Sequence, residues 1–137
     1  MRDYLREPVS NGNPREQALI RRWWHETHAA KGLLVWEYHL EGRYADAIWF
    51  PDVDEAGAEK PGKDATKLYP IRGQRIVLCE AKLSLNPEVV GQALIYAQFA
   101  EDAGAEVSDI AVFCESGSDS LRRTARELGL TLVIGPL

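Results

Sequence analysis

The sequence has 137 residues, of which 45% are hydrophobic and 27% carry a charge. This length and apolar content suit one domain, residues 1–137, with a buried core and no room for a second domain. The formal net charge of −5 argues against a protein that coats nucleic acid non-specifically, because such proteins are usually basic, but it is compatible with an acidic metal site beside a local basic surface.

No apolar stretch approaches the length that is needed to cross a membrane, and residues 1–7 lack the apolar run of a signal peptide. We therefore expect a cytoplasmic protein with no membrane partner. Cys79 and Cys114 both lie in apolar, strand-like runs, which predicts two buried reduced thiols rather than a disulfide or a metal pair. The histidines are scattered without the spacing of metal ligands, so we expect structural roles for His25, His28 and His39.

A polar arm and a helix open the chain. Residues 1–12 have no clear hydrophobic period and are expected to form a loose arm. Asn13-Pro14-Arg15-Glu16 is typical of a helix start, with an asparagine cap, a proline at the first position and a glutamate at the third that can reach back to the cap. Gly32 is a natural end for this helix.

A hairpin and a long loop follow. Residues 33–40 and 43–50 read as two strands joined by a tight turn at Glu41-Gly42. Asp46 lies among apolar residues of the second strand, where burying an unpaired carboxylate is costly. Residues 51–71 contain turn-forming residues and mixed charges, which indicates a long loop that is either a substrate lid or disordered.

The second half of the chain alternates strands and helices. A third strand is expected at 72–82, a helix from Asn86-Pro87-Glu88 to Gly104, a strand at 108–114, a helix at 118–128 and a short strand at 130–134. The order α-β-β-β-α-β-α-β predicts a mixed sheet with an antiparallel meander and a parallel pair, with helices covering both faces.

The candidate catalytic residues lie at the end of the third strand and on the strand that precedes it. Glu80 and Lys82 are two apart, so in a strand they project from the same face. Asp46 lies on the preceding strand of the meander and can reach Glu80. Two carboxylates with the carbonyl of Ala81 between them form an oxygen-rich site that suits Mg²⁺ or Mn²⁺.

Asp46 followed by Glu80-x-Lys82 on the next strand resembles the motif of the PD-(D/E)XK nuclease superfamily, although Ala45 replaces the proline of its name. The resemblance covers residues 13–115 and implies an α/β fold with a restriction-endonuclease-like αβββαβ core, a mixed central sheet flanked by helices, to which a C-terminal helix and a short strand are added. It also implies hydrolysis of DNA phosphodiesters with Mg²⁺ or Mn²⁺. Asp46 and Glu80 would be metal ligands, with Lys82 the catalytic lysine.

Further motifs narrow this resemblance. Gln92-Ala93-Leu94-Ile95-Tyr96 is similar to the Gln-x-x-x-Tyr motif of RecB-like members, in which the pair contacts DNA or braces the site. RecB-like members also have a histidine before the aspartate, and His25 and His28 are the candidates for it in this sequence. The helix start at residues 13–19 resembles that of Holliday-junction resolvases, and it favours Glu16 over Glu26 as an accessory acid on the first helix.

The alternative is a catalytically inactive module of the same fold that binds nucleic acid or takes part in an assembly. Substrate structure, endonuclease or exonuclease mode, sequence preference and oligomeric state stay open. A homodimer would account for the abundance of tryptophan, at Trp23, Trp24, Trp36 and Trp49. A basic surface for DNA could be formed by the arginines of the last helix with residues around the long loop, namely Arg122, Arg123, Arg126, Lys60, Lys63, Lys67, Arg72 and Arg75.

Overall fold

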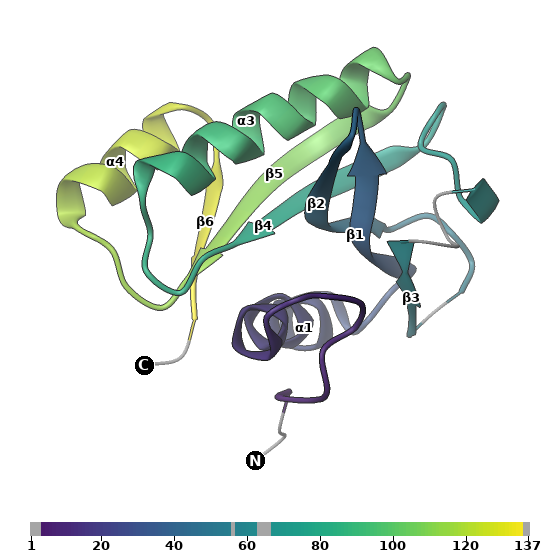
Figure 1. Ribbon diagram of the computed structural model, residues 1–137, viewed down its shortest axis with the longest axis horizontal. Helices are drawn as coiled ribbons and strands as arrows, with labels where there is room; N and C mark the ends of the chain where they lie inside the picture. The colour runs from purple at the N-terminus through teal and green to yellow at the C-terminus, as the bar shows by residue number, and fades with distance from the viewer. Residues whose placement is uncertain (1–3, 56, 63–66, 136–137) are drawn as a thin grey trace.

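The computed structural model describes residues 4–55, 57–62 and 67–135. Its α/β fold is organised around a six-stranded mixed sheet with the order β3-β1-β2-β4-β5-β6 (Figure 1). The antiparallel meander is formed by β1, β2 and β4, and the parallel part continues through β5 and β6, as predicted. The strands are β1 (Leu33–Leu40), β2 (Arg43–Phe50), β3 (Ala58–Pro61), β4 (Arg75–Ala81), β5 (Glu106–Cys114) and β6 (Thr131–Ile134).

Helices cover both faces of the sheet. Helix α1 (Pro14–His28) lies on one face, and α3 (Pro87–Asp102) and α4 (Asp119–Glu127) lie on the other (Figure 1). Asparagine caps begin the first two, because the Asn13 side chain accepts from the main chain of Glu16 and the Asn86 side chain accepts from that of Val89. The predicted helix starts are therefore confirmed.

The hairpin between β1 and β2 has the two-residue turn that the sequence predicts. Glu41 and Gly42 both have positive φ, 50° and 74°, which is the geometry that matches the twist of a two-stranded hairpin. This turn pairs Leu40 with Arg43 and fixes the register along both strands. The register in turn decides which residue faces Asp46.

Two segments are more ordered than predicted. The described part of the N-terminal arm is held in place: Tyr4 is buried, and the Gln17 side chain exchanges two hydrogen bonds with the main chain of Val9. The prediction of a loose arm is wrong for these residues. The long loop contains β3, which pairs in parallel with β1 at the edge of the sheet. Lys63 lies outside the described residues.

A buried ion pair explains why both segments are fixed. The Arg21 guanidinium on α1 is 1% exposed, and its Nε donates to the Glu59 carboxylate on β3 at 3.0 Å. The indole of Trp36 donates to the same carboxylate at 2.9 Å, and Arg21 also donates to the main-chain oxygen of Tyr4 at 2.7 Å. A buried arginine must find such partners, and these lie in segments that show no hydrophobic period.

The tryptophans belong to the core of the chain. Trp24 and Trp36 are fully buried, Trp49 is 6% exposed, and Trp23 packs partly buried between Trp49 and Phe113. They fill the space between α1 and the sheet, where large side chains are needed to pack a helix on a flat surface. The tryptophans therefore give no support to the expected homodimer interface.

Two further expectations concern the environment of the protein. Cys79 and Cys114 are buried and are not joined in a disulfide, which confirms the prediction of reduced thiols. In the described ranges, no helix is both long and apolar enough to cross a membrane.

Candidate functional site: a carboxylate pair where two strands part

The ladder between β2 and β4 ends at the acids. The last paired residues are Ala47 and Cys79, and the next positions along the two strands are Asp46 and Glu80. Here the side chains take over the hydrogen bonds of the ladder. The Asp46 main-chain N–H donates to Glu80 Oε2 at 2.6 Å, and the Ala81 main-chain N–H donates to Asp46 Oδ2 at 2.8 Å. The two carboxylates are thus fixed side by side at the point where the strands separate.

Burial and repulsion act together on this pair. Glu80 is 2% exposed, and burial, followed by the charge of Asp46, raises its pKa well above the ordinary value. Burial raises the pKa of Asp46 to about 6, and the charges of Glu16 and Glu37 add to this effect. The hydrogen bond from Ala81 and the charge of Lys82 oppose it. Perturbed carboxyl groups of this kind are typical of functional sites.

Glu37 is a residue of this site that the sequence analysis missed. Its neighbours Trp36 and Tyr38 pair with Ala47 and Ala45, so Glu37 lies opposite Asp46 in the hairpin. Glu37 has a φ of 52°, a left-handed conformation that is uncommon for a glutamate and costs about 1–3 kcal/mol. The predicted turn at Glu41-Gly42 already pairs position 37 with position 46. An acid at position 37 of an apolar strand, opposite Asp46, is therefore the sequence feature that could have identified Glu37.

Both strands break their side-chain alternation at this pair. On β1, Trp36 packs under α1 but Tyr38, two residues later, packs under α3. On β2, Ala47 packs under α1 and Ala45 under α3. In a regular strand residues two apart share a face, so the alternation changes at Glu37 and at Asp46. The irregularity lets both acids border the α1 side of the sheet.

A pocket of about 240 Å³ lies between α1 and the sheet at this point. We call it the carboxylate pocket; its lining includes Asn11, Glu16, Glu37, Asp46 and Ala81. Glu16 is thus brought to Asp46, as the motif on the first helix predicts. Glu26 lines a different pocket, near Val133 and Ile134, and pairs with Arg22 at 3.1 Å.

The other predicted site residues lie around the pair in different ways. Lys82 follows β4, has an exposed side chain, and lowers the pKa of Asp46 through its charge. Tyr96 on α3 is partly buried, and its pKa is raised by burial and by the charge of Glu80. Gln92 is exposed, and within the described part of the chain no hydrogen bond or ion pair joins it to the carboxylates.

Two histidines and three of the expected basic residues have other partners. His28 packs on Trp23 and Trp49, His25 packs on Tyr4 and Trp24, and neither lines the carboxylate pocket. Three of the expected basic residues form ion pairs with nearby acids, namely Arg75 with Asp52, Arg122 with Asp119 and Arg123 with Glu127. These pairs reduce the basic character of the surface that was expected to meet DNA.

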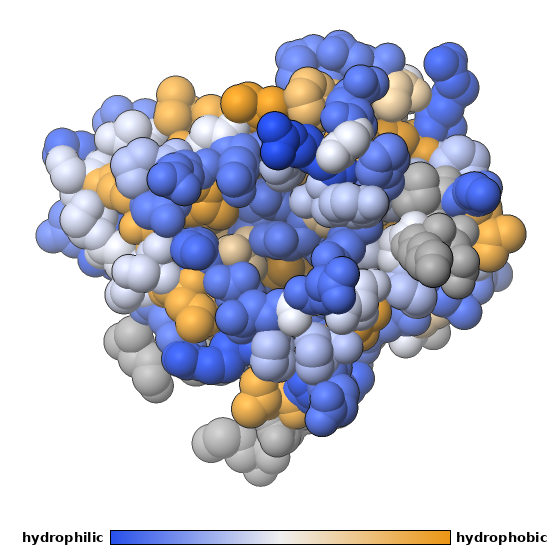
Figure 2. Space-filling model, in the orientation of Figure 1, coloured by the Kyte–Doolittle hydropathy of each residue, from blue (hydrophilic) through white to orange (hydrophobic). Residues whose placement is uncertain are grey.

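One face of the molecule has a hydrophilic hollow. Figure 2 shows that the molecule is hollowed between α1 and α3 and that hydrophilic residues line most of the hollow. Asp46 and Glu80 lie on β2 and β4, strands of the sheet that α1 and α3 cover from opposite faces, and Tyr96 lies on α3. A charged or strongly polar ligand would be compatible with such a lining.

The donor set suits a hard divalent cation. In residues 4–55, 57–62 and 67–135, no group of three or more His, Cys, Asp and Glu side chains is placed to hold a metal ion. Mg²⁺, however, is usually held by one or two carboxylates and keeps several waters. The two carboxylates of Asp46 and Glu80 therefore match the number and the chemical type of ligands that Mg²⁺ takes from a protein. Burial and the charges of neighbouring acids raise both pKa values, and a cation would favour the charged form of each carboxylate. The residues therefore fit Mg²⁺ or Mn²⁺.

Comparisons of the chain with protein-family models, with curated proteins and with solved structures found no match. A functional assignment therefore depends on the residues of this chain and on their geometry.

Proposed function

We propose that this protein is a divalent-metal-dependent DNA nuclease of the PD-(D/E)XK type. The observation that carries the proposal is the Asp46–Glu80 pair, fixed by reciprocal main-chain hydrogen bonds at the point where β2 and β4 stop pairing. Two adjacent carboxylates with raised pKa values are poorly stabilised by the protein alone, and they are well suited to share a cation. The order of the elements that carry the acids is that of the nuclease motif.

Each residue has a distinct role in this proposal. Asp46, Glu80 and the main-chain carbonyl of Ala81 would hold Mg²⁺ or Mn²⁺, and Glu16 would act as an accessory acid through water. Glu16, Asp46 and Ala81 line the carboxylate pocket, whereas Glu80 is buried beside it and is joined to Asp46 by the main-chain hydrogen bond. When bound, the metal would lower the pKa of a coordinated water, and its positive charge would stabilise the negative charge of the scissile phosphate. Lys82, exposed beside Asp46, orients that water or stabilises the negative charge of the transition state.

The remaining predicted residues bind the substrate. Tyr96 lies near Glu80 on the α3 side, where its hydroxyl can contact a DNA phosphate or brace the carboxylate. Gln92, one helical turn earlier, is exposed and is available to the same DNA strand. These two residues position substrate and take no part in proton transfer.

The test is cleavage of labelled duplex, single-stranded and branched DNA in Mg²⁺, Mn²⁺ or EDTA. We expect metal-dependent cleavage by the wild type and its loss in both Asp46→Asn and Lys82→Ala. Glu26→Gln is the matched control, because it removes an exposed acid from the same helix as Glu16, and it should cleave like the wild type.

Metal binding separates the roles of the two variants. Calorimetric titration with Mn²⁺ should show weakened binding in Asp46→Ala and near-normal binding in Lys82→Ala. Unchanged binding in Asp46→Ala would show that the site is assigned wrongly. A wild type that binds DNA with no turnover in any metal would point instead to the inactive binding module.

A further inference from the structure

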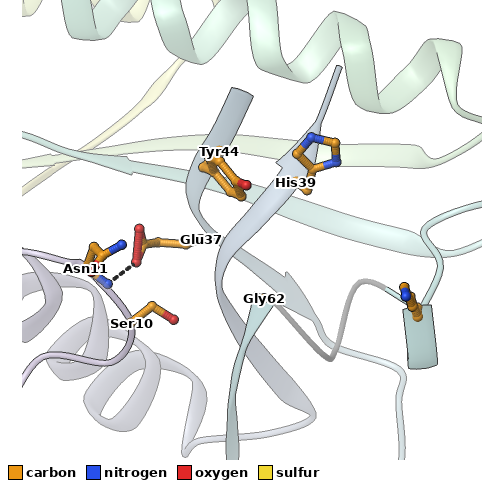
Figure 3. Close-up of a pocket in the computed structure, with 7 residues that line it drawn as sticks. Ser10, Asn11, Glu37, His39, Tyr44 and Gly62 are labelled. Atoms are coloured by element: carbon orange, nitrogen blue, oxygen red, sulfur yellow. Dashed lines mark hydrogen bonds between the residues drawn. The ribbon is translucent and has the colours of Figure 1, made fainter. Parts of the chain in front are cut away.

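A second, larger pocket adjoins the carboxylate pocket. It has a volume of about 630 Å³ and is lined by Ser10, Asn11, Glu37, His39, Tyr44 and Lys67, among others (Figure 3). We call it the hairpin pocket. Asn11 and Glu37 line both pockets, so the two are adjacent at these residues. The volume lies within the usual range for small-molecule sites and is large enough for one nucleotide.

An exposed aromatic pair forms one side of the hairpin pocket. Tyr44 on β2 is 58% exposed, which is unusual for a large ring in a strand. It pairs across the hairpin with His39, and their ring centroids are 5.3 Å apart (Figure 3). An exposed tyrosine that lines a pocket offers a flat face on which a nucleobase can stack.

The rest of the described lining offers hydrogen bonds and a positive charge. Figure 3 shows Glu37 pointing toward Asn11, whose main-chain N–H donates to Glu37 Oε2 at 2.7 Å. The Asn11 side-chain amide and the second oxygen of Glu37 match the donors and acceptors on the edge of a base. Lys67 supplies a cation for a phosphate.

The position of Tyr44 relates the pocket to the proposed cleavage site. Tyr44 precedes Asp46 by two residues, which spans about 7 Å along a strand. This is about the length of two stacked nucleotides. A base that stacks on Tyr44 would therefore belong to a nucleotide within one or two positions of a phosphate held at Asp46 and Glu80.

We propose that the hairpin pocket binds one unpaired nucleotide of the DNA substrate, with its base stacked on Tyr44. A base that is paired within a duplex cannot enter a pocket, so the proposal names the substrate class: DNA that is single-stranded or carries an unpaired nucleotide beside the cleavage point. The inference rests on the proposed nuclease function, which brings DNA to Asp46 and Glu80.

The experiment follows a fluorescent base into the pocket. A short single-stranded oligonucleotide that contains 2-aminopurine is titrated with the Asp46→Asn protein in EDTA, so that no cleavage occurs. The same titration is repeated with Tyr44→Ala, Tyr44→Phe and Leu128→Ala in that background. Leu128→Ala removes an exposed apolar side chain at the end of α4, outside either pocket.

The proposal requires three results together. Tyr44→Ala should bind about tenfold more weakly and lose the quenching of 2-aminopurine, since a stacked base contributes about that much affinity. Tyr44→Phe keeps the ring and should retain both, as should Leu128→Ala. A matched duplex should bind more weakly than the single strand. The proposal would be overturned if Tyr44→Ala bound the oligonucleotide and quenched 2-aminopurine as well as the Asp46→Asn protein with Tyr44 does. Equal binding of duplex and single strand would also overturn it.

Failure of the pocket and failure of the nuclease give different results. If the wild type cleaves DNA with metal and Tyr44→Ala cleaves and binds like it, the nuclease stands and the pocket assignment falls. If single-stranded binding depends on Tyr44 but no metal supports cleavage, the pocket stands and the nuclease assignment falls.

Discussion

Asp46 and Glu80 each hydrogen-bond the main chain of the strand that carries the other acid. Glu80 accepts from the Asp46 N–H, and Asp46 accepts from the N–H of Ala81, the residue after Glu80. These bonds hold two buried carboxylates together. Burial raises the pKa of both groups, and the charge of Asp46 adds to the shift of Glu80, while the charges of Glu16 and Glu37 add to that of Asp46. The cost of this arrangement should appear in the free energy of unfolding, both in its dependence on pH and in its response to divalent metal.

In the absence of metal, the wild type should lose stability as the pH rises from about 4 to about 6. The pKa of Asp46 is raised to about 6 from an ordinary value of 3.8, so the folded state binds the proton more tightly than the unfolded state does. The resulting contribution is fully present below the unfolded pKa and is lost as the pH passes the folded one. Its size is on the order of 3 kcal/mol, and Glu80 acts in the same direction.

Urea unfolding in EDTA across this pH range checks the prediction, with Asp46→Asn as the comparison. The asparagine oxygen can still accept from Ala81 but carries no charge. The variant should therefore be more stable than the wild type near neutral pH and similar to it at about pH 4. A wild type whose stability is the same at both pH values would contradict the raised pKa.

Divalent metal should stabilise the wild type at neutral pH and do so much less at about pH 5, where the carboxylates are largely protonated. The melting temperature in Mg²⁺ or Mn²⁺ against EDTA measures this effect. Asp46→Asn should abolish the metal-induced shift, Glu16→Gln should reduce it, and Glu26→Gln should leave it unchanged. An equal reduction by Glu16→Gln and Glu26→Gln would argue against a role for Glu16.

Arg21→Met should destabilise the protein strongly, whereas Arg22→Met should not. Arg21 is buried and pairs with Glu59, so its loss leaves a largely buried carboxylate without its main partner, at a cost of about 3 kcal/mol or more. Arg22 pairs with Glu26 on the surface, where such a pair contributes less than about 1 kcal/mol. Urea unfolding of the two variants measures the difference, and similar losses would contradict the assigned role of the buried pair.

Glu37→Gly should be more stable than Glu37→Ala by about 1 kcal/mol, because glycine adopts a positive φ without steric cost. Both variants remove the carboxylate and its bond to Asn11, so their difference isolates the backbone conformation. Chemical unfolding at one pH is the measurement. If Glu37→Ala were the more stable variant, the left-handed conformation at this position would be in doubt.

Local patterns determined most of the fold. The two Asn-Pro helix starts, the Glu41-Gly42 turn and the apolar runs of the strands are recognisable because caps, turns and hydrophobic periods depend on neighbours in the sequence. The turn also fixes a register by itself, so the meeting of Glu37 and Asp46 follows from the hairpin. The grouping of Asp46 near Glu80 follows similarly from the order of the meander strands.

Only the tertiary structure decided how the acids are held and what lies around them. The arm and β3 are fixed by Arg21 and Glu59, two charged residues that are 38 positions apart and carry no periodic signal. The sequence favours Glu16 over Glu26 as the acid of the first helix, but the pockets in which the two acids lie are set by the packing of α1 on the sheet. The break of alternation at Glu37 and Asp46 likewise depends on the packing of two helices on opposite faces of the sheet, a long-range condition that sequence periodicity does not contain.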